Sequence, residues 1–163
     1  MCWSMNDRDL GLYVSMLHFC DRIKEKVDRF RVDEDLWFAD EDIRDMIYVS
    51  VQQIGEKAAK LSDPQQDFPD LEWPGIKGMR NVLVHNYNNI DPQIVWNTIT
   101  TEVPPLRKAL LSNQAIRNFY EQSEPDFANN TVTDLLADLS TRGSANVHGE
   151  EIPRTHNDEW PDL

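Results

Sequence analysis

Side chains that can bind phosphate and transfer protons are concentrated near the middle of the chain. Arg80 is followed directly by Asn81, then by His85 five positions on and by Tyr87 seven positions on. The arginine guanidinium is a planar fork that suits phosphate oxygens, and histidine gains or loses a proton near neutral pH. This combination is suited to chemistry at a phosphodiester.

Cleavage of RNA by its own 2′-hydroxyl needs groups of these kinds. A base removes the 2′ proton, an acid protonates the leaving 5′ oxygen, and a cation stabilises the charged phosphorane. Arg80 and His85 could supply the cation and a proton-transfer group. The scheme requires no metal, and no two His or Cys residues have the spacing of metal ligands, so we assign neither a metal nor another cofactor.

The spacing of these residues constrains how they could meet. Arg80 and Tyr87 are seven residues apart and would share one face of a helix, whereas His85 lies about 140° around an ideal helix from Arg80. A helix end near His85, or a long reach by the Arg80 side chain, would be needed to bring the two together. A purely structural alternative has Arg80 in a salt bridge, His85 at a helix C-terminus and Tyr87 packed against neighbours.

Four amphipathic helices are expected to carry this segment. Apolar residues recur at helical spacing over residues 7–31, after Asn6 as a cap, and over 41–62, after Asp40 as a cap. A third helix opens at Trp73-Pro74, and a fourth at Asp91-Pro92. The residues expected to face inward are Leu10, Tyr13, Val14, Leu17, Cys20, Val27, Ile43, Met46, Ile47, Ser50, Ile54, Ala58, Leu61, Ile76, Met79, Val82, Leu83, Ile94, Val95, Ile99, Val103, Leu106 and Leu110.

Other segments are expected to connect or end these helices. The acidic run 33–35 is predicted to be a solvated connection, and residues 63–70 a loop. The pair Pro104-Pro105 lacks two amide donors, so it should kink or restart the fourth helix.

Short connections between four helices predict an all-α antiparallel bundle of four to five helices. Residues 1–112 are expected to form this domain, and residues 113–163 an acidic C-terminal extension with one or two short helices, near 115–122 and 131–140. Residues 141–163 are polar and rich in turn formers, so we expect this part to be disordered.

The charge restricts the classes of function. The formal net charge is −13; residues 1–112 carry 13 Lys and Arg against 19 Asp and Glu, and residues 113–163 carry 3 against 10. This balance argues against broad electrostatic binding of nucleic acid, and favours a partner with a basic face or local contact with RNA. The sequence contains no run of roughly 20 apolar residues, so no membrane span is predicted, and no secretory signal is visible. Cys20 is expected to be a buried free thiol. We therefore expect a cytoplasmic protein.

The central segment resembles the HepT family of HEPN ribonuclease toxins. Residues 78–87 carry the family's Arg-x4-His-x-Tyr pattern with an Asn after the Arg, between Trp73-Pro74 and Ile90-Asp91. The run Ile54–Ala58 is similar to the end of the family's second helix, and Val103–Leu106 to a proline break in its last helix. The resemblance extends over about residues 7–112.

This resemblance implies a HEPN-like bundle that forms a homodimer, with a metal-independent endoribonuclease site at the interface cleft. Arg80 would contact the scissile phosphate, His85 would transfer protons and Asn81 would orient the site. A site shared between two chains would also explain how Arg80 and His85 could act together although they lie about 140° apart on an ideal helix. Glu56 is a candidate for a supporting ion pair to Arg80 across the helix pair; the alternative is a solvated carboxylate.

The resemblance also implies the toxin half of a type VII-like toxin–antitoxin module. Its antitoxin would be an MntA-like nucleotidyltransferase that AMPylates Tyr87, adding bulk and negative charge at the site. Silencing by binding alone, with Tyr87 purely structural, stays open. RNA is the expected substrate, and neither DNA nor a membrane is an expected partner.

Two other classes of function compete with the enzyme. One is a non-catalytic helical subunit that binds a nucleotidyltransferase or a nucleotide and holds an anion between Arg80 and His85. The other is a purely structural four-helix dimerisation module.

Overall fold

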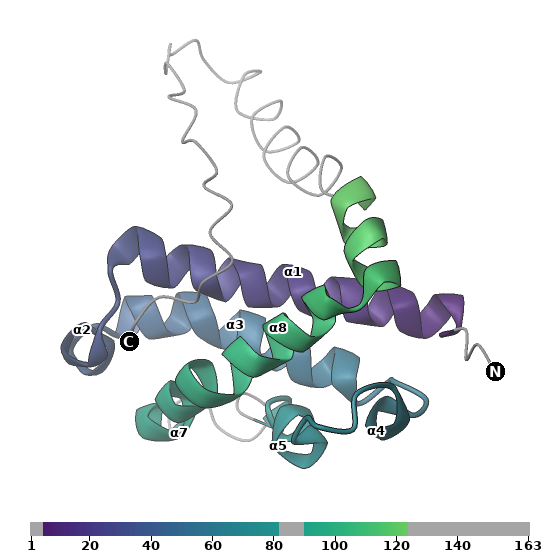
Figure 1. Ribbon diagram of the computed structural model, residues 1–163. Coiled ribbons are helices and arrows are strands. Elements are labelled where there is room, and N and C mark those ends of the chain that lie inside the picture. The colour runs from purple at the N-terminus through teal and green to yellow at the C-terminus, as the bar shows by residue number, and fades with distance from the viewer. Residues whose placement is uncertain (1–4, 82–89, 124–163) are drawn as a thin grey trace, which may run out of the picture.

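The computed structural model describes residues 5–81 and 90–123, and throughout these it is built from helices, turns and loops without a strand (Figure 1). The elements are α1 (Asp7–Phe30), α2 (Glu34–Ala39), α3 (Glu41–Ala58), α4 (Pro64–Asp67), α5 (Trp73–Gly78), α7 (Pro92–Asn97), the π-helical turn η2 (Thr98–Glu102) and α8 (Val103–Ser112). Residues 114–123 are also helical. His85, Tyr87 and the helix predicted at 131–140 lie outside the described residues.

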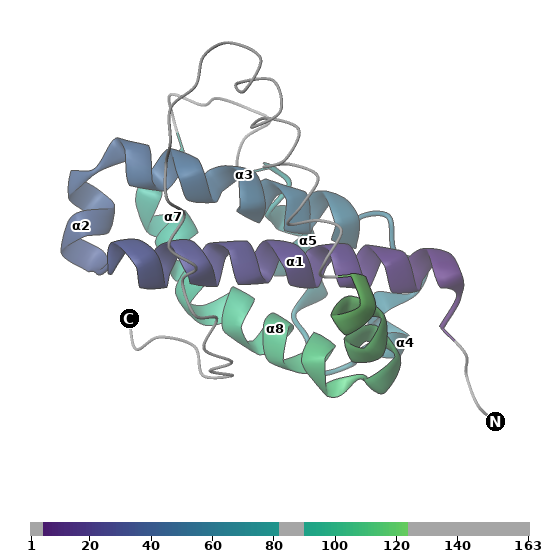
Figure 2. The same cartoon turned by 90° about the horizontal axis from the view of Figure 1, so that it is seen from above.

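The long helix α1 is the centre of the bundle. It lies between α3 on one side and α8 on the other, and α2 turns the chain so that α3 runs back along it (Figure 2). The apolar stripes of the three helices meet in one core; its fully buried members include Tyr13, Leu17, Ile23, Ile47, Ile54, Ile99, Leu106 and Leu110. The prediction of an all-α bundle is confirmed. None of the helices in the described part is long and apolar enough to cross a membrane.

Acidic and amide side chains start most of these helices. Each accepts a hydrogen bond from a backbone amide of the first turn; the capping residues are Asn6, Asp33, Asp40, Asp63, Asp91 and Asn113. Such a cap typically contributes about 0.5–2 kcal/mol. The caps predicted at Asn6, Asp40 and Asp91 are confirmed, and part of the chain's acidic charge therefore has a structural role.

Residues 33–35 are exposed to solvent, as predicted, but they cap and begin a helix, so the prediction of a mere connection is wrong. Asp33 caps α2, whose buried Trp37 packs against Trp96 and Tyr48 at ring-centroid distances of 5.6 and 5.9 Å. The Trp37 indole donates a hydrogen bond of 2.9 Å to the carbonyl of Pro92. A short helix thus joins α3 to the start of α7.

Two other bounds differ from the prediction. The helix α3 ends at Ala58, before the predicted residue 62, and α4 forms one turn inside the predicted loop 63–70.

The diproline produces a π-helical turn. Pro104 and Pro105 cannot donate to the carbonyls one α-helical turn earlier, and their rings would collide with those carbonyls. The chain widens over η2, where the amide of Val103 donates to the carbonyl of Thr98, five residues back. The sequence predicted a kink or a restart at the diproline, and the structure shows a restart, because the α-helix α8 begins at Val103 after the π-helical turn. Upstream of this turn, Ile94 is 60 % exposed and Trp96 is buried instead, so the prediction that Ile94 faces inward is wrong.

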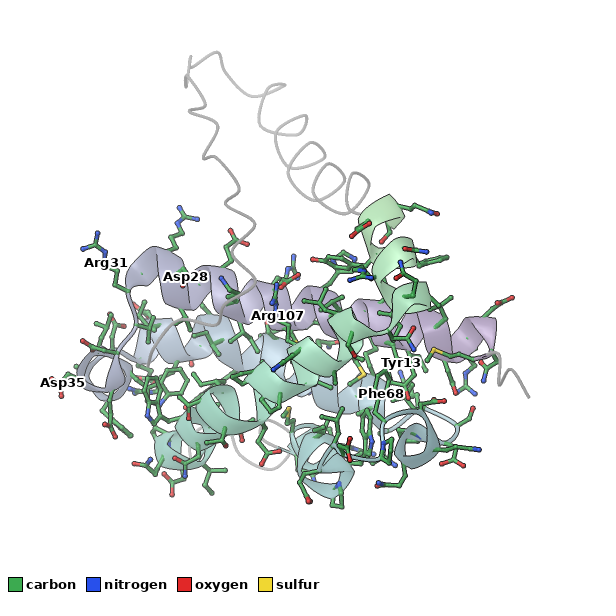
Figure 3. All side chains as sticks on the ribbon, in the orientation of Figure 1. Tyr13, Asp28, Arg31, Asp35, Phe68 and Arg107 are labelled. Atoms are coloured by element: carbon green, nitrogen blue, oxygen red, sulfur yellow. The ribbon has the colours of Figure 1, made fainter. Side chains whose placement is uncertain are left out.

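Residues 114–123 pack into the same core as the bundle. Ile116 is fully buried. The Asp21 carboxylate of α1 accepts from Arg107 Nε at 2.6 Å, and its other oxygen accepts from the hydroxyl of Tyr120. Figure 3 shows Arg107 between α8 and α1. The first part of the predicted extension is therefore docked on α1; the domain boundary at residue 112 stays a prediction.

Replacing Ile116 by Ala should lower the free energy of unfolding by about 2–5 kcal/mol, because it leaves a cavity beneath the helix at 114–123. The control is Phe119→Ala on the same helix, where the side chain is 49 % exposed and the change should be about 0.5 kcal/mol or less. Urea unfolding of the two variants measures both values. Equal losses would mean that Ile116 is not part of the cooperative core.

Candidate active site

Arg80 lies in a turn just after α5. Met79, the C-cap of α5, is buried, whereas Arg80 and Asn81 are exposed. The amide of Arg80 donates to the carbonyl of Lys77 at 3.4 Å. One buried side chain therefore anchors the chain directly before two polar side chains that face solvent.

Gly55 of α3 brings this turn against α3. A Cβ atom added to Gly55 would lie 2.1 Å from the amide nitrogen of Arg80 and 2.7 Å from the carbonyl carbon of Met79. Both atoms are backbone, so they cannot swing aside as the end of a side chain could. Only glycine permits this separation of α3 and the Arg80 turn, and the backbone of Arg80 has little freedom in that direction.

Glu56, the next residue of α3, faces the Arg80 side chain. The distance from Arg80 Nε to Glu56 Oε1 is 4.0 Å, and the two side chains are 49 % and 32 % exposed. The ion pair predicted from the sequence is present. Because both groups are well solvated, the pair orients the guanidinium more than it stabilises the fold, and it leaves part of the guanidinium open to solvent.

An aromatic cluster supports the start of α5. Trp73 is buried and donates from its indole to the carbonyl of Phe68 at 3.0 Å. Tyr13 of α1 packs edge-on against Phe68 at 5.2 Å and donates its hydroxyl to Asp67 at 2.8 Å. Tyr13 and Phe68 lie together at one end of α1 in Figure 3. Burial and the Asp67 carboxylate raise the pKa of Tyr13, so this hydroxyl stays protonated and keeps its bond.

The structure brings together three of the five predicted site residues. Arg80, Asn81 and Glu56 lie in one region between α5 and the end of α3, while His85 and Tyr87 fall outside the described residues. The sequence analysis did not predict the role of Gly55. The signal that could have indicated it is the position of Gly55 in the Ile-Gly-Glu run directly before Glu56. Among the residues described, no group of three His, Cys, Asp or Glu side chains could hold a metal ion.

Comparison with known proteins identifies the family. The profile described as "Ribonuclease HepT-like" matches residues 16–112, which is more than half of the chain. The chain belongs to the HepT-like family. The match includes α3 with Gly55 and Glu56, the Arg80 turn and the diproline, and it stops before the helix at 114–123.

Individual HepT-like relatives are similar over part of their length. A candidate RNase from Methanocaldococcus jannaschii is 31 % identical over 40 % of this chain and 62 % of its own length. A candidate RNase from Caldanaerobacter subterraneus subsp. tengcongensis is 35 % identical over 36 % of this chain and 54 % of its own. The protein named "Probable ribonuclease HepT" from Thermococcus cleftensis is 27 % identical over the same shares, 36 % and 54 %. The chain thus spans little more than half the length of these relatives, and no solved structure matches it.

Replacing Gly55 by Ala should destabilise the fold by about 3 kcal/mol, the upper end of overpacking costs, because backbone must move. The matched control is Gly11→Ala in α1, where a Cβ would meet nothing within 4 Å and Ala should gain about 0.5–1 kcal/mol from helix propensity. Thermal and urea unfolding measure both changes. A Gly55→Ala variant as stable as the Gly11→Ala variant would contradict the close packing of α3 on the Arg80 turn.

Proposed function

We propose that this protein is a metal-independent endoribonuclease, with Arg80 and His85 as its catalytic residues. The observation that carries the proposal is the position of Arg80: its backbone is fixed against Gly55, its neighbour Met79 is buried, and its guanidinium reaches solvent beside Glu56. Membership of a family described as ribonucleases adds to it.

The chemistry follows from the types of the side chains. Arg80 contacts the scissile phosphate and stabilises the charge of the phosphorane, for which a planar, permanently charged fork is suited. His85 transfers the proton at the 2′-hydroxyl or at the leaving 5′ oxygen. Glu56 holds the guanidinium in position by the ion pair, and Asn81, exposed beside Arg80, orients the substrate.

A homodimer would complete the site. Arg80 lies in the turn after α5, and the family resemblance implies a cleft between two chains in which the Arg80 of one chain meets the His85 of the other. The described part of α3 supports such an arrangement in one respect: Val49, two turns before Glu56, is 56 % exposed and offers apolar surface near the site.

The acidic charge of the chain limits how RNA is bound. With a net charge of −13, long-range attraction of RNA is weak, so affinity has to come from the few cations at the cleft. A transient encounter with RNA suits an enzyme of this kind, which we expect to act in the cytoplasm.

Purified protein should cleave RNA in the presence of EDTA, and Arg80→Ala or His85→Ala should lower the rate by roughly 10²–10⁴-fold, the range of general acid–base catalysis. Single-turnover cleavage of a labelled RNA measures the rates. Arg22→Ala, which removes an exposed arginine on α1, is the matched control for charge and should keep the wild-type rate.

The outcomes separate the competing classes of function. Equal cleavage by wild type and by the Arg80→Ala/His85→Ala double variant would overturn the proposal. RNA or nucleotide binding without turnover would favour the non-catalytic subunit, and the absence of both would favour the structural dimerisation module.

We propose further that the enzyme is a toxin silenced by AMPylation of Tyr87. Co-expression with an MntA-like nucleotidyltransferase should raise the mass of the chain by one or more AMP groups and abolish RNA cleavage, since the added phosphate repels the RNA backbone. Intact-mass and peptide spectrometry measure the modification, and Tyr87→Phe is the control. Silencing with an unchanged mass would instead mean that the antitoxin acts by binding.

A further inference from the structure

The carboxylate of Glu102 lies on α5, the helix that leads to Arg80. A Cβ atom on Gly75 would be 2.9 Å from Glu102 Oε2 and 3.2 Å from Oε1. Glycine at position 75 therefore leaves the space that this carboxylate occupies. The contact joins the π-helical turn η2 to the short helix before the Arg80 turn.

The π-helical turn holds Glu102 in this place. Glu102 is the last residue of η2, and the buried side chains of Ile99 and Val103 fix η2 in the core on either side of it. The widened turn is imposed by the diproline that follows, as described above. The backbone position of Glu102 is thus determined by packing and by proline geometry, and its side chain projects from a rigid base.

The helix α5 needs contacts of this kind. It has six residues, and Glu72 at its N-terminus provides no side-chain cap. Isolated helices of this length are unstable in water, so the neighbours of α5 determine where it lies. On one side of α5, Ile76 and Met79 are buried, and the turn after α5 meets α3 at Gly55. From η2, the Glu102 carboxylate lies beside Gly75 of α5.

We infer that Glu102 is a positioning residue for Arg80, acting through α5. The helix is held between the close contact at Gly55 and the carboxylate at Gly75, and this placement determines where the Arg80 guanidinium meets a phosphate. The inference rests on the proposed ribonuclease function, and it extends that function to a residue outside the Arg-x4-His segment. Misplacing a catalytic group by about 1 Å can cost roughly 10²-fold in rate.

The decisive variant is Gly75→Ala. The new methyl group displaces the carboxylate, which is the flexible end of a side chain, while the backbone can stay in place. Alanine also favours a helix over glycine by about 0.5–1 kcal/mol. The variant should therefore be at least as stable as wild type, yet its kcat for RNA cleavage should fall by roughly 10–100-fold with little change in KM.

Three further variants complete the test. Glu102→Ala should lower kcat by the same factor, and Gly75→Ala combined with Glu102→Ala should show no additional loss, because both changes remove one contact. Glu102→Gln keeps the size of the side chain that fills the space beside Gly75, and should retain most of the rate. Gly78→Ala is the matched control in α5, since nothing lies within 4 Å of a Cβ there, and its kcat should equal that of wild type.

Wild-type activity in both Gly75→Ala and Glu102→Ala would overturn the inference, as would loss of activity that merely follows loss of stability. Amide hydrogen exchange distinguishes this failure from a failure of the proposed function. Even if the wild-type protein cleaves no RNA, Glu102→Ala should speed exchange at residues 76–81 and leave α1 unchanged. Unaltered exchange at residues 76–81 would show that Glu102 does not hold α5.

Discussion

The backbone contact between Gly55 and the Arg80 turn is the constraint on which the candidate site depends. It fixes the distance between α3 and the end of α5, and therefore where Met79 enters the core and where Arg80 leaves it. Glu56 faces the guanidinium because it follows the residue at the contact point. With a larger residue at position 55, the two backbones would separate and the ion pair, already at 4.0 Å, would open.

The acidic composition is easier to understand once the partners of the carboxylates are known. Several aspartates cap helices, and others bind groups within the bundle: Asp9 accepts from the amide and hydroxyl of Ser62, and Asp67 accepts from the buried Tyr13. These carboxylates still count toward the net charge, but their positions are set by folding rather than by a partner. The net charge therefore describes the long-range field and says little about the short-range chemistry beside Arg80.

Sequence reasoning succeeded where periodicity and capping chemistry agreed. The long helices α1 and α3 repeat their apolar stripe several times after a clear cap at Asn6 and at Asp40, so both could be predicted. The helix α2 is too short to show a period, and its acidic first turn resembled a loop although Asp33 caps it. Ile94 was assigned to the core because it is apolar and precedes Val95, although it lies about 120° from Leu106 on an ideal helix. Trp96 lies closer to the apolar stripe, and the structure buries it.

The candidate site was predictable in part for similar reasons. The Arg80–Glu56 pair follows from the packing of α3 against α5 and the turn after it, and it was predicted from the sequence. The proximity of Gly55 to Arg80 and of Glu102 to Gly75 depends on tertiary packing between segments distant in sequence, and glycine carries no side chain to signal it. The small residues Ser50 and Ala58 were expected to face inward and both are buried, but the residue of α3 that the Arg80 turn approaches closely is Gly55.

The docking of residues 114–123 separates two meanings of a domain boundary. The family profile ends at residue 112, which marks what this chain shares with its relatives. The folded unit extends further, because Ile116 fills part of the core and Asp21 divides its two oxygens between Arg107 and Tyr120. A protein shortened to the shared length would carry a void and a carboxylate with half its partners, so minimal versions of this bundle should be designed from its packing rather than from homology.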